Sequence, residues 1–165
     1  SAPELSVLMA YTKIVLAEPA NAQLLGSGQS QKRGPGGAPA ASHPAFEPHP
    51  IQGWTPDFIP QVLQEAVDGK YYDQIMPIAG PKAIEWARAL AQREGIFTGI
   101  SGGATFGIAH QVAERAPEGS VILCILPDAG ERYLSTPMFD SIPADMDAEE
   151  IALSHSTPGF HLAAE

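Results

Sequence analysis

The chain has 165 residues, of which 44% are hydrophobic and 17% charged, and this length suits one domain. Nine Lys and Arg against 19 Asp and Glu give a formal net charge of −10, which argues against a nucleic-acid-binding surface because such a surface must be basic. No apolar run approaches the roughly 20 residues of a membrane span. The single cysteine, Cys124, excludes a disulfide framework and a cysteine-based metal site, and a soluble, cysteine-poor chain is expected in the cytoplasm.

Four segments before residue 96 have a recognisable secondary-structure pattern. Branched and apolar residues predict strands at 13–17 and 71–78. Apolar side chains at helical spacing predict helices over 57–67 and 81–94. The second of these helices has a proline at its first position and a glycine directly after its last, as helix ends prefer.

Residues 96–126 predict a strand–helix–strand unit. Strands are expected at 96–100 and 120–126, with a tight turn at 101–103 and a helix at 104–116 between them. The second strand is apolar at every position from 121 to 126, which predicts cover on both faces, as in a parallel sheet, and a packing role for Cys124. A strand, helix and strand of this length form a right-handed βαβ unit, so the predicted fold class is α/β.

Two segments have compositions that oppose regular structure. Ten of the 25 residues at 26–50 are Gly or Pro, so we expect an irregular and mobile loop inserted into the domain. The last 26 residues, from Asp140, hold six acidic residues and no Lys or Arg, which predicts a solvated, partly disordered acidic tail. The expected organisation is one domain at 1–140 and a tail at 141–165.

The candidate site lies at the ends of the two predicted strands of this unit. Ser101 and Gly102 follow the first strand and Asp128 follows the second, and ligands of open α/β sheets bind outside the carboxyl ends of the strands. If the strands are neighbours, about 5 Å apart, Ser101 and Asp128 lie within roughly 10 Å of each other at one ligand edge. The alternative is purely structural, with Ser101 as a helix N-cap and the glycines as a turn.

The same serine also fits a hydrolase pattern. Residues 99–103 (GISGG) match the G-x-S-x-G nucleophile elbow in a strand-to-helix context. Asp128 and a later His155 or His161 would follow the Ser, Asp, His order of α/β-hydrolases. Both histidines lie in the polar tail and no oxyanion motif precedes them, so a Ser101 hydrolase stands as an alternative function.

Four motifs occur in order along the chain, at residues 50–53 (PIQG), 57–60 (DFIP), 94–104 (EGIFTGISGGA) and 125–136 (ILPDAGERYLST). Together they resemble the C-terminal half of cysteine synthase (O-acetylserine sulfhydrylase), a fold-type-II pyridoxal-phosphate enzyme. The resemblance covers about residues 13–139, and its most specific part is the string GERYLST. It implies a three-layer sheet of mostly parallel strands with helices on both faces, and pyridoxal 5′-phosphate as the cofactor.

The resemblance also implies roles for individual residues. Ser101 matches the serine whose neutral hydroxyl bonds the pyridine nitrogen of the cofactor, and Asp128 and Gly102 line the same edge. Gln52 and Gly53 match the loop on the substrate side of the cofactor. The family has small residues after this pair, whereas this sequence has Trp54, and a bulky side chain beside the pocket argues against a preference for acetylserine.

The chain lacks other parts of the family's machinery. Schiff-base chemistry needs a positioned lysine, and none of the four lysines stands in a setting like the family's. Lys13 precedes a strand, Lys32 lies in the Gly- and Pro-rich loop, and Lys70 and Lys82 flank turns and a helix start. The substrate-carboxylate loop and the Gly-rich phosphate cradle are also absent, so no catalytic residue is assigned and the isolated chain is expected to be inactive.

The absent parts imply partners. The missing N-terminal half, or a second chain, is expected to complete an enzyme that makes L-cysteine from O-acetylserine and sulfide. A homodimer and an association with serine acetyltransferase follow from the resemblance as well. A non-catalytic interaction module that keeps only the fold is the remaining alternative.

Overall fold

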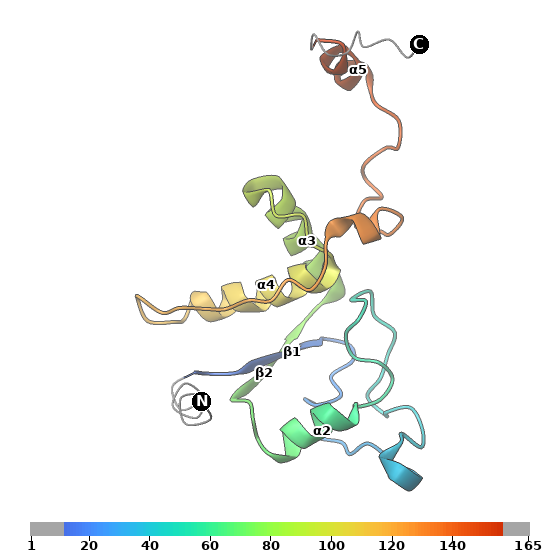
Figure 1. The fold of residues 1–165 in the computed structure, drawn as a ribbon, viewed down its shortest axis with the longest axis vertical. Helices are drawn as coiled ribbons and strands as arrows, with labels where there is room; N and C mark the ends of the chain where they lie inside the picture. Colours follow the sequence, from blue (N-terminus) through green and yellow to red (C-terminus); the bar gives the residue numbers. More distant parts are fainter. Residues whose placement is uncertain (1–11, 157–165) are drawn as a thin grey trace.

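Two parallel strands form a small sheet against which one helix packs (Figure 1). The computed structural model describes residues 12–156, and within them β1 (Val15–Pro19) and β2 (Gln74–Ile78) pair in parallel, with Val15 opposite Gln74. β1 and β2 carry mostly apolar side chains, which suit a half-buried extended backbone. Both strands predicted before residue 96 are confirmed, and each begins a few residues later than expected.

The helices follow the periodic placement of apolar side chains. Within residues 12–156 they are α2 (Gln61–Asp68), α3 (Gly80–Ala89), α4 (Ile100–Ala113) and α5 (Ala148–Ser154). The three predicted helices correspond to α2, α3 and α4, although α4 begins four residues earlier than expected. A π-helical turn extends α3 to Glu94, and Gly95 follows with a left-handed φ of 69° that glycine adopts without strain. No helix in this part of the chain is long and apolar enough to cross a bilayer.

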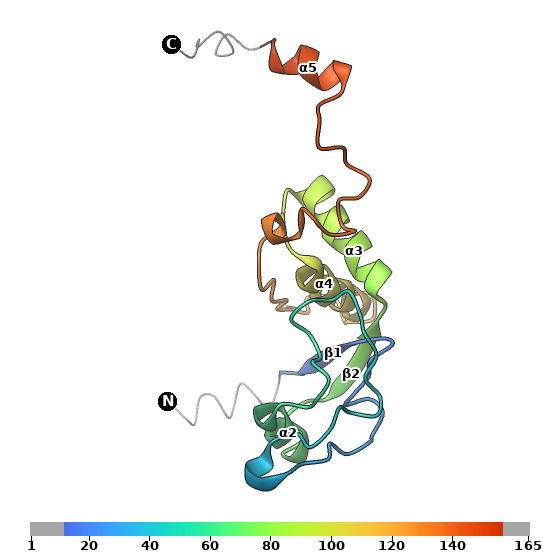
Figure 2. The same ribbon diagram turned by 90° about the vertical axis from the view of Figure 1, so that its right-hand side faces the viewer.

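Helix α4 packs on the sheet and α3 packs on α4, an arrangement that Figures 1 and 2 show from two sides. The core between them consists of buried apolar residues from the strands, both helices and two loops: Ile51, Met76, Ile78, Ala83, Ala87, Ile100, Ala104, Ile108, Tyr133 and Met138. The two helices approach most closely at Gly103, where an added Cβ would collide with the carbonyl oxygen of Ala83. The absence of a side chain at Gly103 is what allows this approach.

The structure corrects the expected strand–helix–strand unit. Residues 96–100 and 120–126 are not strands, because neither segment has a strand beside it within the described residues, where the sheet consists of β1 and β2 alone. Residues 101–103 are not a turn and instead form part of the first turn of α4. The α/β class itself is confirmed, with parallel strands and helices packed on them.

The loop at 26–50 is irregular, as predicted, apart from a short 3-10 turn at Pro35–Gly37. Buried polar side chains hold the loop together and attach it to the rest of the fold. Gln31 Oε1 accepts a hydrogen bond of 3.0 Å from the amide of Ile59. His43 is 2% exposed, and its ring bonds to the carbonyl of Gln29 and the amide of Ala45. The mobility of the loop stays a prediction.

Helix α5 lies apart from the other helices, beyond an extended connection (Figures 1 and 2). Its N-terminus carries a capping box, in which the Asp147 carboxylate accepts from the Glu150 amide and the Glu150 carboxylate accepts from the Asp147 amide. The helix is exposed along nearly its whole length, in keeping with a solvated tail. Residues 157–165, which include His161, lie outside the described residues, and the domain division at residue 140 stays a prediction.

Candidate functional site

A pocket of about 510 Å³ opens where the first turn of α4 meets two loops. Its lining comes from a turn near residue 53, from α4 and from the segment after residue 126: Gln52, Gly53, Trp54, Ser101, Pro127, Asp128 and Arg132. Five of the six site residues expected from the sequence therefore lie in one pocket, and Gly102 is the one outside its lining.

Ser101 lies in the first turn of α4 and is 4% exposed. The N-cap position belongs to Gly99, and no side chain caps this helix, so the alternative that Ser101 is the N-cap is wrong. The Ser101 carbonyl accepts from Thr105 Oγ1 at 2.9 Å, one turn further along the helix. The Ser101 hydroxyl lies beside the phenol of Tyr133 and belongs to the wall of the pocket.

A buried tyrosine holds the Asp128 side chain in place. Tyr133, 3% exposed, donates a hydrogen bond of 2.8 Å from its phenol to Asp128 Oδ2. The other carboxylate oxygen, Oδ1, is buried and has no hydrogen-bond partner among residues 12–156. Burial and the Asp128 carboxylate raise the pKa of Tyr133 above its ordinary value, while the Ser101 hydroxyl and the Arg132 guanidinium act in the opposite direction.

Ser101 and Asp128 converge for a different reason from the one expected. Adjacent parallel strands were to bring them together, but the structure pairs Thr98 with Ala129 in a short antiparallel bridge. The amide of Gly99 and the hydroxyl of Thr98 both donate to the carbonyl of Asp128, at 3.3 and 3.1 Å. We call the bridge and these two hydrogen bonds the clasp. The clasp places the start of α4 against the segment after residue 126.

Glycines at the start of α4 serve this packing. A Cβ at Gly99 would collide with the Tyr133 ring and the Asp128 carboxylate, and a Cβ at Gly102 would collide with the Thr98 hydroxyl. The absence of a side chain at Gly102 therefore leaves room for the Thr98 side chain, and Gly102 is not among the residues that line the pocket. A contact between the Gly102 backbone and a cofactor stays a prediction.

The opposite wall is a tight turn at residues 51–54. Ile51 is fully buried, and its carbonyl accepts from the Trp54 amide at 3.3 Å. Gly53 has a φ of 82°, which glycine adopts without strain, so the turn depends on it. Trp54 packs against the core and also borders a second pocket of about 290 Å³, whose walls are mostly apolar.

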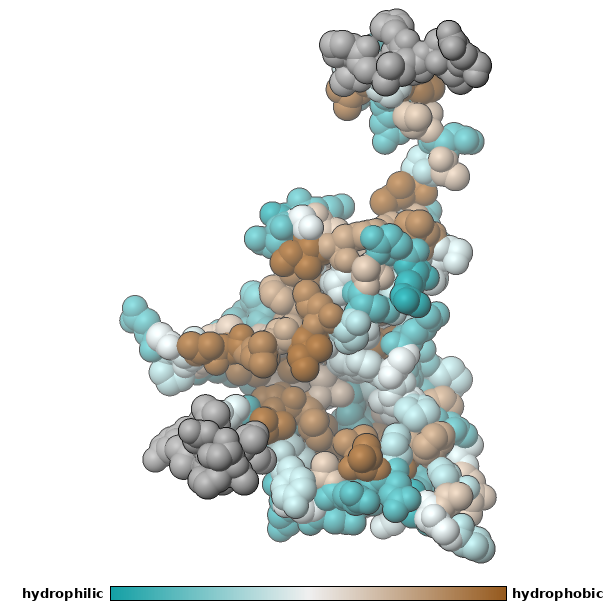
Figure 3. All heavy atoms as spheres, in the orientation of Figure 1, coloured by the Kyte–Doolittle hydropathy of each residue, from teal (hydrophilic) through white to brown (hydrophobic). Residues whose placement is uncertain are grey.

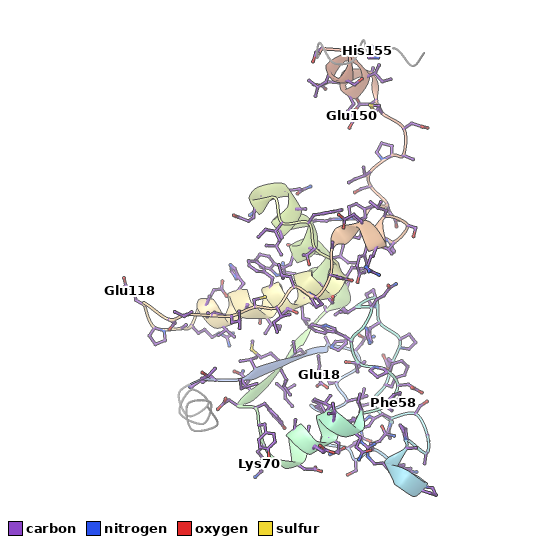
Figure 4. All side chains as sticks on the ribbon, in the orientation of Figure 1. Glu18, Phe58, Lys70, Glu118, Glu150 and His155 are labelled. Carbon is purple, nitrogen blue, oxygen red and sulfur yellow. The ribbon has the colours of Figure 1, made fainter. Side chains whose placement is uncertain are left out.

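The sequence reasoning missed the site roles of Arg132 and Tyr133. Neither residue was assigned to the site from the sequence, yet Arg132 lines the pocket and Tyr133 holds Asp128. Their position directly after Asp128 in the specific GERYLST string was the available signal. Glu18 was missed as well. It lies at the end of β1 (labelled in Figure 4), is 4% exposed and accepts from the amides of Leu25 and Gly26.

The pocket contains neither a lysine nor a histidine. Lys82 instead pairs with Glu85 at 2.8 Å on the outside of α3. Among the residues that the structure describes, Ser101 and Asp128 therefore meet without a histidine, and no cluster of His, Cys, Asp and Glu forms a metal site. The Ser, Asp, His arrangement of a hydrolase is not assembled in this part of the chain.

Comparison with known proteins identifies related sequences. The family model described as "Pyridoxal-phosphate dependent enzyme" matches residues 4–128. The O-ureido-L-serine synthase of Streptomyces lavendulae is 40% identical over 143 residues, which are 87% of this chain and 38% of that protein. A cysteine synthase of Staphylococcus aureus is 38% identical over 105 residues, 64% of this chain and 33% of that enzyme. The chain thus spans well under half the length of these relatives.

Solved structures agree with this result. A crystal structure of O-ureido-L-serine synthase aligns with a TM-score of 0.69 and 39% identity, covering 91% of this chain and 41% of that one. A cysteine synthase from Entamoeba histolytica aligns with a TM-score of 0.60 and 30% identity, covering 87% of this chain and 36% of that one. The similarity in fold supports the α/β class from an independent direction.

Proposed function

The chain belongs to the family of pyridoxal-phosphate-dependent enzymes, and from that premise we propose that it forms one wall of the active site of a β-replacement enzyme. The reaction is replacement of the leaving group on the β-carbon of an activated L-serine by a nucleophile. The observation that carries the proposal is the pocket that joins Ser101 and Asp128 to Gln52, Gly53 and Trp54.

The pocket suits one edge of the cofactor ring. Ser101 offers a neutral hydroxyl from a buried position, which binds an aromatic ring nitrogen without protonating it. Oδ1 of Asp128 is buried and accepts no hydrogen bond from residues 12–156, so it is available to accept one from a bound group. When bound, the cofactor supplies the electron sink that allows a substituent to leave the β-carbon. Ser101 and Asp128 would orient the ring, while Gln52 and Trp54 would border the substrate.

The nucleophile separates two versions of this function. The GERYLST string and the relationship to cysteine synthases favour sulfide, which gives L-cysteine from O-acetylserine. The O-ureido-L-serine synthase matches a larger share of this chain, and its product name implies hydroxyurea as the nucleophile. Trp54 lines the pocket beside Gln52 and Gly53, on the wall that we assign to the substrate, and a bulky side chain on that wall would select between nucleophiles of different size.

The wall does not form a complete active site. No lysine lines the pocket, and the chain covers 38% of the length of the O-ureido-L-serine synthase that it matches. We infer that residues beyond these 165 supply the lysine, the phosphate-binding loop and the loop for the substrate carboxylate. The isolated chain is then inactive in cysteine synthesis.

A chimera tests the proposal. Residues 12–139 would replace the matched segment of the Streptomyces lavendulae enzyme, and the purified chimera would be assayed with O-acetylserine and either sulfide or hydroxyurea. We expect the absorption band of bound cofactor and turnover with at least one nucleophile, and Ser101→Ala should shift the band and lower kcat at least tenfold. Ser120→Ala, the same change at an exposed serine outside the pocket lining, is the matched control.

A chimera that folds but binds no cofactor would contradict the proposal. For the isolated chain, borohydride reduction with added pyridoxal phosphate followed by peptide mapping should label no single lysine stoichiometrically. Stoichiometric labelling of one lysine together with sulfide-dependent cysteine formation would show the expected inactivity to be wrong.

A further inference from the structure

Thr55, the residue after Trp54 in the wall of the pocket, has a strained backbone. Its φ is 39°, in the left-handed region, and within residues 12–156 Lys70 is the only other non-glycine residue with a positive φ. A β-branched side chain such as that of threonine rarely adopts this conformation, because it crowds its own backbone. Such strain persists only where the surrounding structure holds the residue, and residues strained in this way gather at functional sites.

The ring of His49 holds this strained residue. His49 Nε2 lies 3.1 Å from the carbonyl oxygen of Thr55, and because a carbonyl only accepts, Nε2 carries the proton and donates. Phe46 packs edge-on against the imidazole, with the ring centroids 6.4 Å apart. The other ring nitrogen, Nδ1, is buried and has no hydrogen-bond partner among residues 12–156. The bond to Thr55 is therefore the polar contact that orients this ring.

The glycine- and proline-rich loop also holds the residues that follow the strained position. The amide of His43 donates to the carbonyl of Asp57 at 2.6 Å. At Ile59, which is 4% exposed, the amide donates to Gln31 Oε1 at 3.0 Å and the carbonyl accepts from the Arg33 guanidinium at 2.8 Å. Every second residue of the segment is thus bonded to the loop, so the segment cannot slide along its own length to relieve the strain.

The loop and the segment that it holds lie together at the lower right of Figure 1, where Phe58 is labelled in Figure 4. In Figure 3 the surface of this region is mostly hydrophilic, in contrast to the hydrophobic atoms that gather near α4. Buried polar groups attach the loop to the segment, among them the Gln31 side chain, which is 8% exposed.

Trp54 lies between the strained residue and a fixed turn. On the other side of Trp54, its own amide donates to the carbonyl of the fully buried Ile51. Gly53 and Trp54 line both the pocket of about 510 Å³ and the apolar pocket of about 290 Å³. A change of the Thr55 φ to an ordinary negative value would rotate the chain directly after Trp54 and change where its indole divides the two pockets.

We propose that His49 is a positioning residue, which fixes Trp54 by holding the strained backbone of Thr55 and thereby determines which nucleophile the pocket accepts. The identity of the nucleophile rests on the proposed function, whereas the position of Trp54 depends on the fold alone. Sulfide is small enough to tolerate a displaced indole. Hydroxyurea is larger and requires the space that the held indole leaves.

The first experiment observes Trp54 in the 165-residue chain without pyridoxal phosphate. The chain has two tryptophans, Trp54 and Trp86, so incorporation of fluorotryptophan gives two fluorine NMR resonances, which Trp86→Phe assigns. We expect His49→Leu to shift the Trp54 resonance or to broaden it at least twofold. His49→Asn should do the same, because its side chain is too short to reach the Thr55 carbonyl. His49→Gln keeps a donor at that distance and should leave the resonance near its native position.

His110→Leu is the matched control, the same change at a histidine outside both pockets. The His110 ring lies 4.7 Å from the Trp86 ring between centroids, so this variant should move the Trp86 resonance and leave that of Trp54 in place.

Thr55→Asn tests whether strain is the reason that His49 is needed. Asparagine adopts left-handed conformations more readily than a β-branched residue does. In the Thr55→Asn background, His49→Leu should therefore no longer displace the Trp54 resonance. Thr55→Asn alone should raise the Tm by about 2–4 °C, since the strain is relieved. A Trp54 displacement equal to that in the native background would contradict the role of Thr55.

The second experiment measures selectivity in the chimera with the Streptomyces lavendulae enzyme. We expect His49→Leu to raise the KM for hydroxyurea at least fivefold, to change the KM for sulfide less than twofold and to leave the absorption band of the cofactor unchanged. His110→Leu should change each KM less than twofold.

The positioning role is overturned by an unchanged Trp54 resonance in His49→Leu and His49→Asn, or by equal changes in KM for the two nucleophiles. Unfolding of both variants, seen as loss of the far-ultraviolet circular dichroism, would assign the His49 bond to stability alone and overturn it too. A chimera that binds no cofactor would count against the proposed function only, because the fluorine spectra report the position of Trp54 without the cofactor.

Discussion

The phenol oxygen of Tyr133 lies 2.8 Å from Oδ2 of Asp128, which is five residues earlier in the chain. Both side chains lie against Gly99, the residue directly before α4. This hydrogen bond joins the core to the pocket, because Tyr133 belongs to the buried apolar cluster while Asp128 lines the pocket. The orientation of the pocket wall therefore depends on the core of the fold.

Removal of this phenol should destabilise the protein. Tyr133→Phe leaves Asp128 without its observed donor, and hydrogen bonds to charged groups contribute about 1.5–3 kcal/mol. We expect a loss of that size in the free energy of unfolding measured by urea denaturation, with little change in the m-value. Tyr71→Phe, at a tyrosine that is 62% exposed, is the control and should change stability by less than about 0.5 kcal/mol. Equal stability of the two variants would show that the Tyr133 bond contributes nothing.

Stability should fall at alkaline pH through the same residue. The pKa of Tyr133 is raised in the folded state, so the unfolded chain loses this proton first as the pH rises. The resulting stability is fully present below pH about 10 and declines above it. The difference in unfolding free energy between the native sequence and Tyr133→Phe should therefore shrink between pH 9 and about 11. A difference that grows over this range would contradict the assigned direction of the pKa shift.

Gly103→Ala should be strongly destabilising. The added Cβ would meet the Ala83 carbonyl and the Ala87 amide across the contact between α3 and α4, and overpacking of this kind costs about 1–3 kcal/mol or more. Gly34→Ala is the control, because a Cβ at Gly34 would meet its nearest atom, the Ala38 carbonyl oxygen, only at 3.9 Å and the φ of Gly34 is −93°. Thermal unfolding followed by circular dichroism compares the two. A Gly103→Ala variant as stable as Gly34→Ala would mean that α3 and α4 separate easily.

Glu18 should hold the start of the 26–50 loop. Its two carboxylate oxygens accept from the amides of Leu25 and Gly26 at 2.7 and 2.9 Å, so Glu18→Ala should speed amide exchange at these two residues at least tenfold. Exchange elsewhere in the loop measures its predicted mobility. We expect faster exchange there than in α4, and protection equal to that of α4 would show the loop to be rigid.

Much of the fold followed from local patterns in the sequence. The run of branched residues before Glu18 predicted β1. Pro81 and Gly95 marked the two ends of the helical segment that begins with α3. These features are local, since helix and strand periodicity and end preferences depend on neighbours within a few residues. The prediction of a strand at 120–126, covered on both faces, failed because an apolar run does not supply the strand that must lie beside it, and Val121 and Leu123 are 96% and 90% exposed.

The candidate site divides in the same way. The resemblance selected Ser101, Asp128 and Gln52 by residue type and order, and the folded chain places all three in one pocket. The contacts that bring Ser101 and Asp128 together could not be predicted from local sequence. They are the Thr98–Ala129 bridge and the hydrogen bond from the Tyr133 phenol to Asp128.

The sequence by itself determined the α/β class and the family resemblance, because both depend on residue identity and short-range spacing. Only the tertiary structure decided that Ser101 lies within a helix and not at its cap, that Gly102 faces Thr98, and that Leu123 is exposed. The physical reason is that burial and hydrogen-bond partners are properties of surfaces brought together by folding.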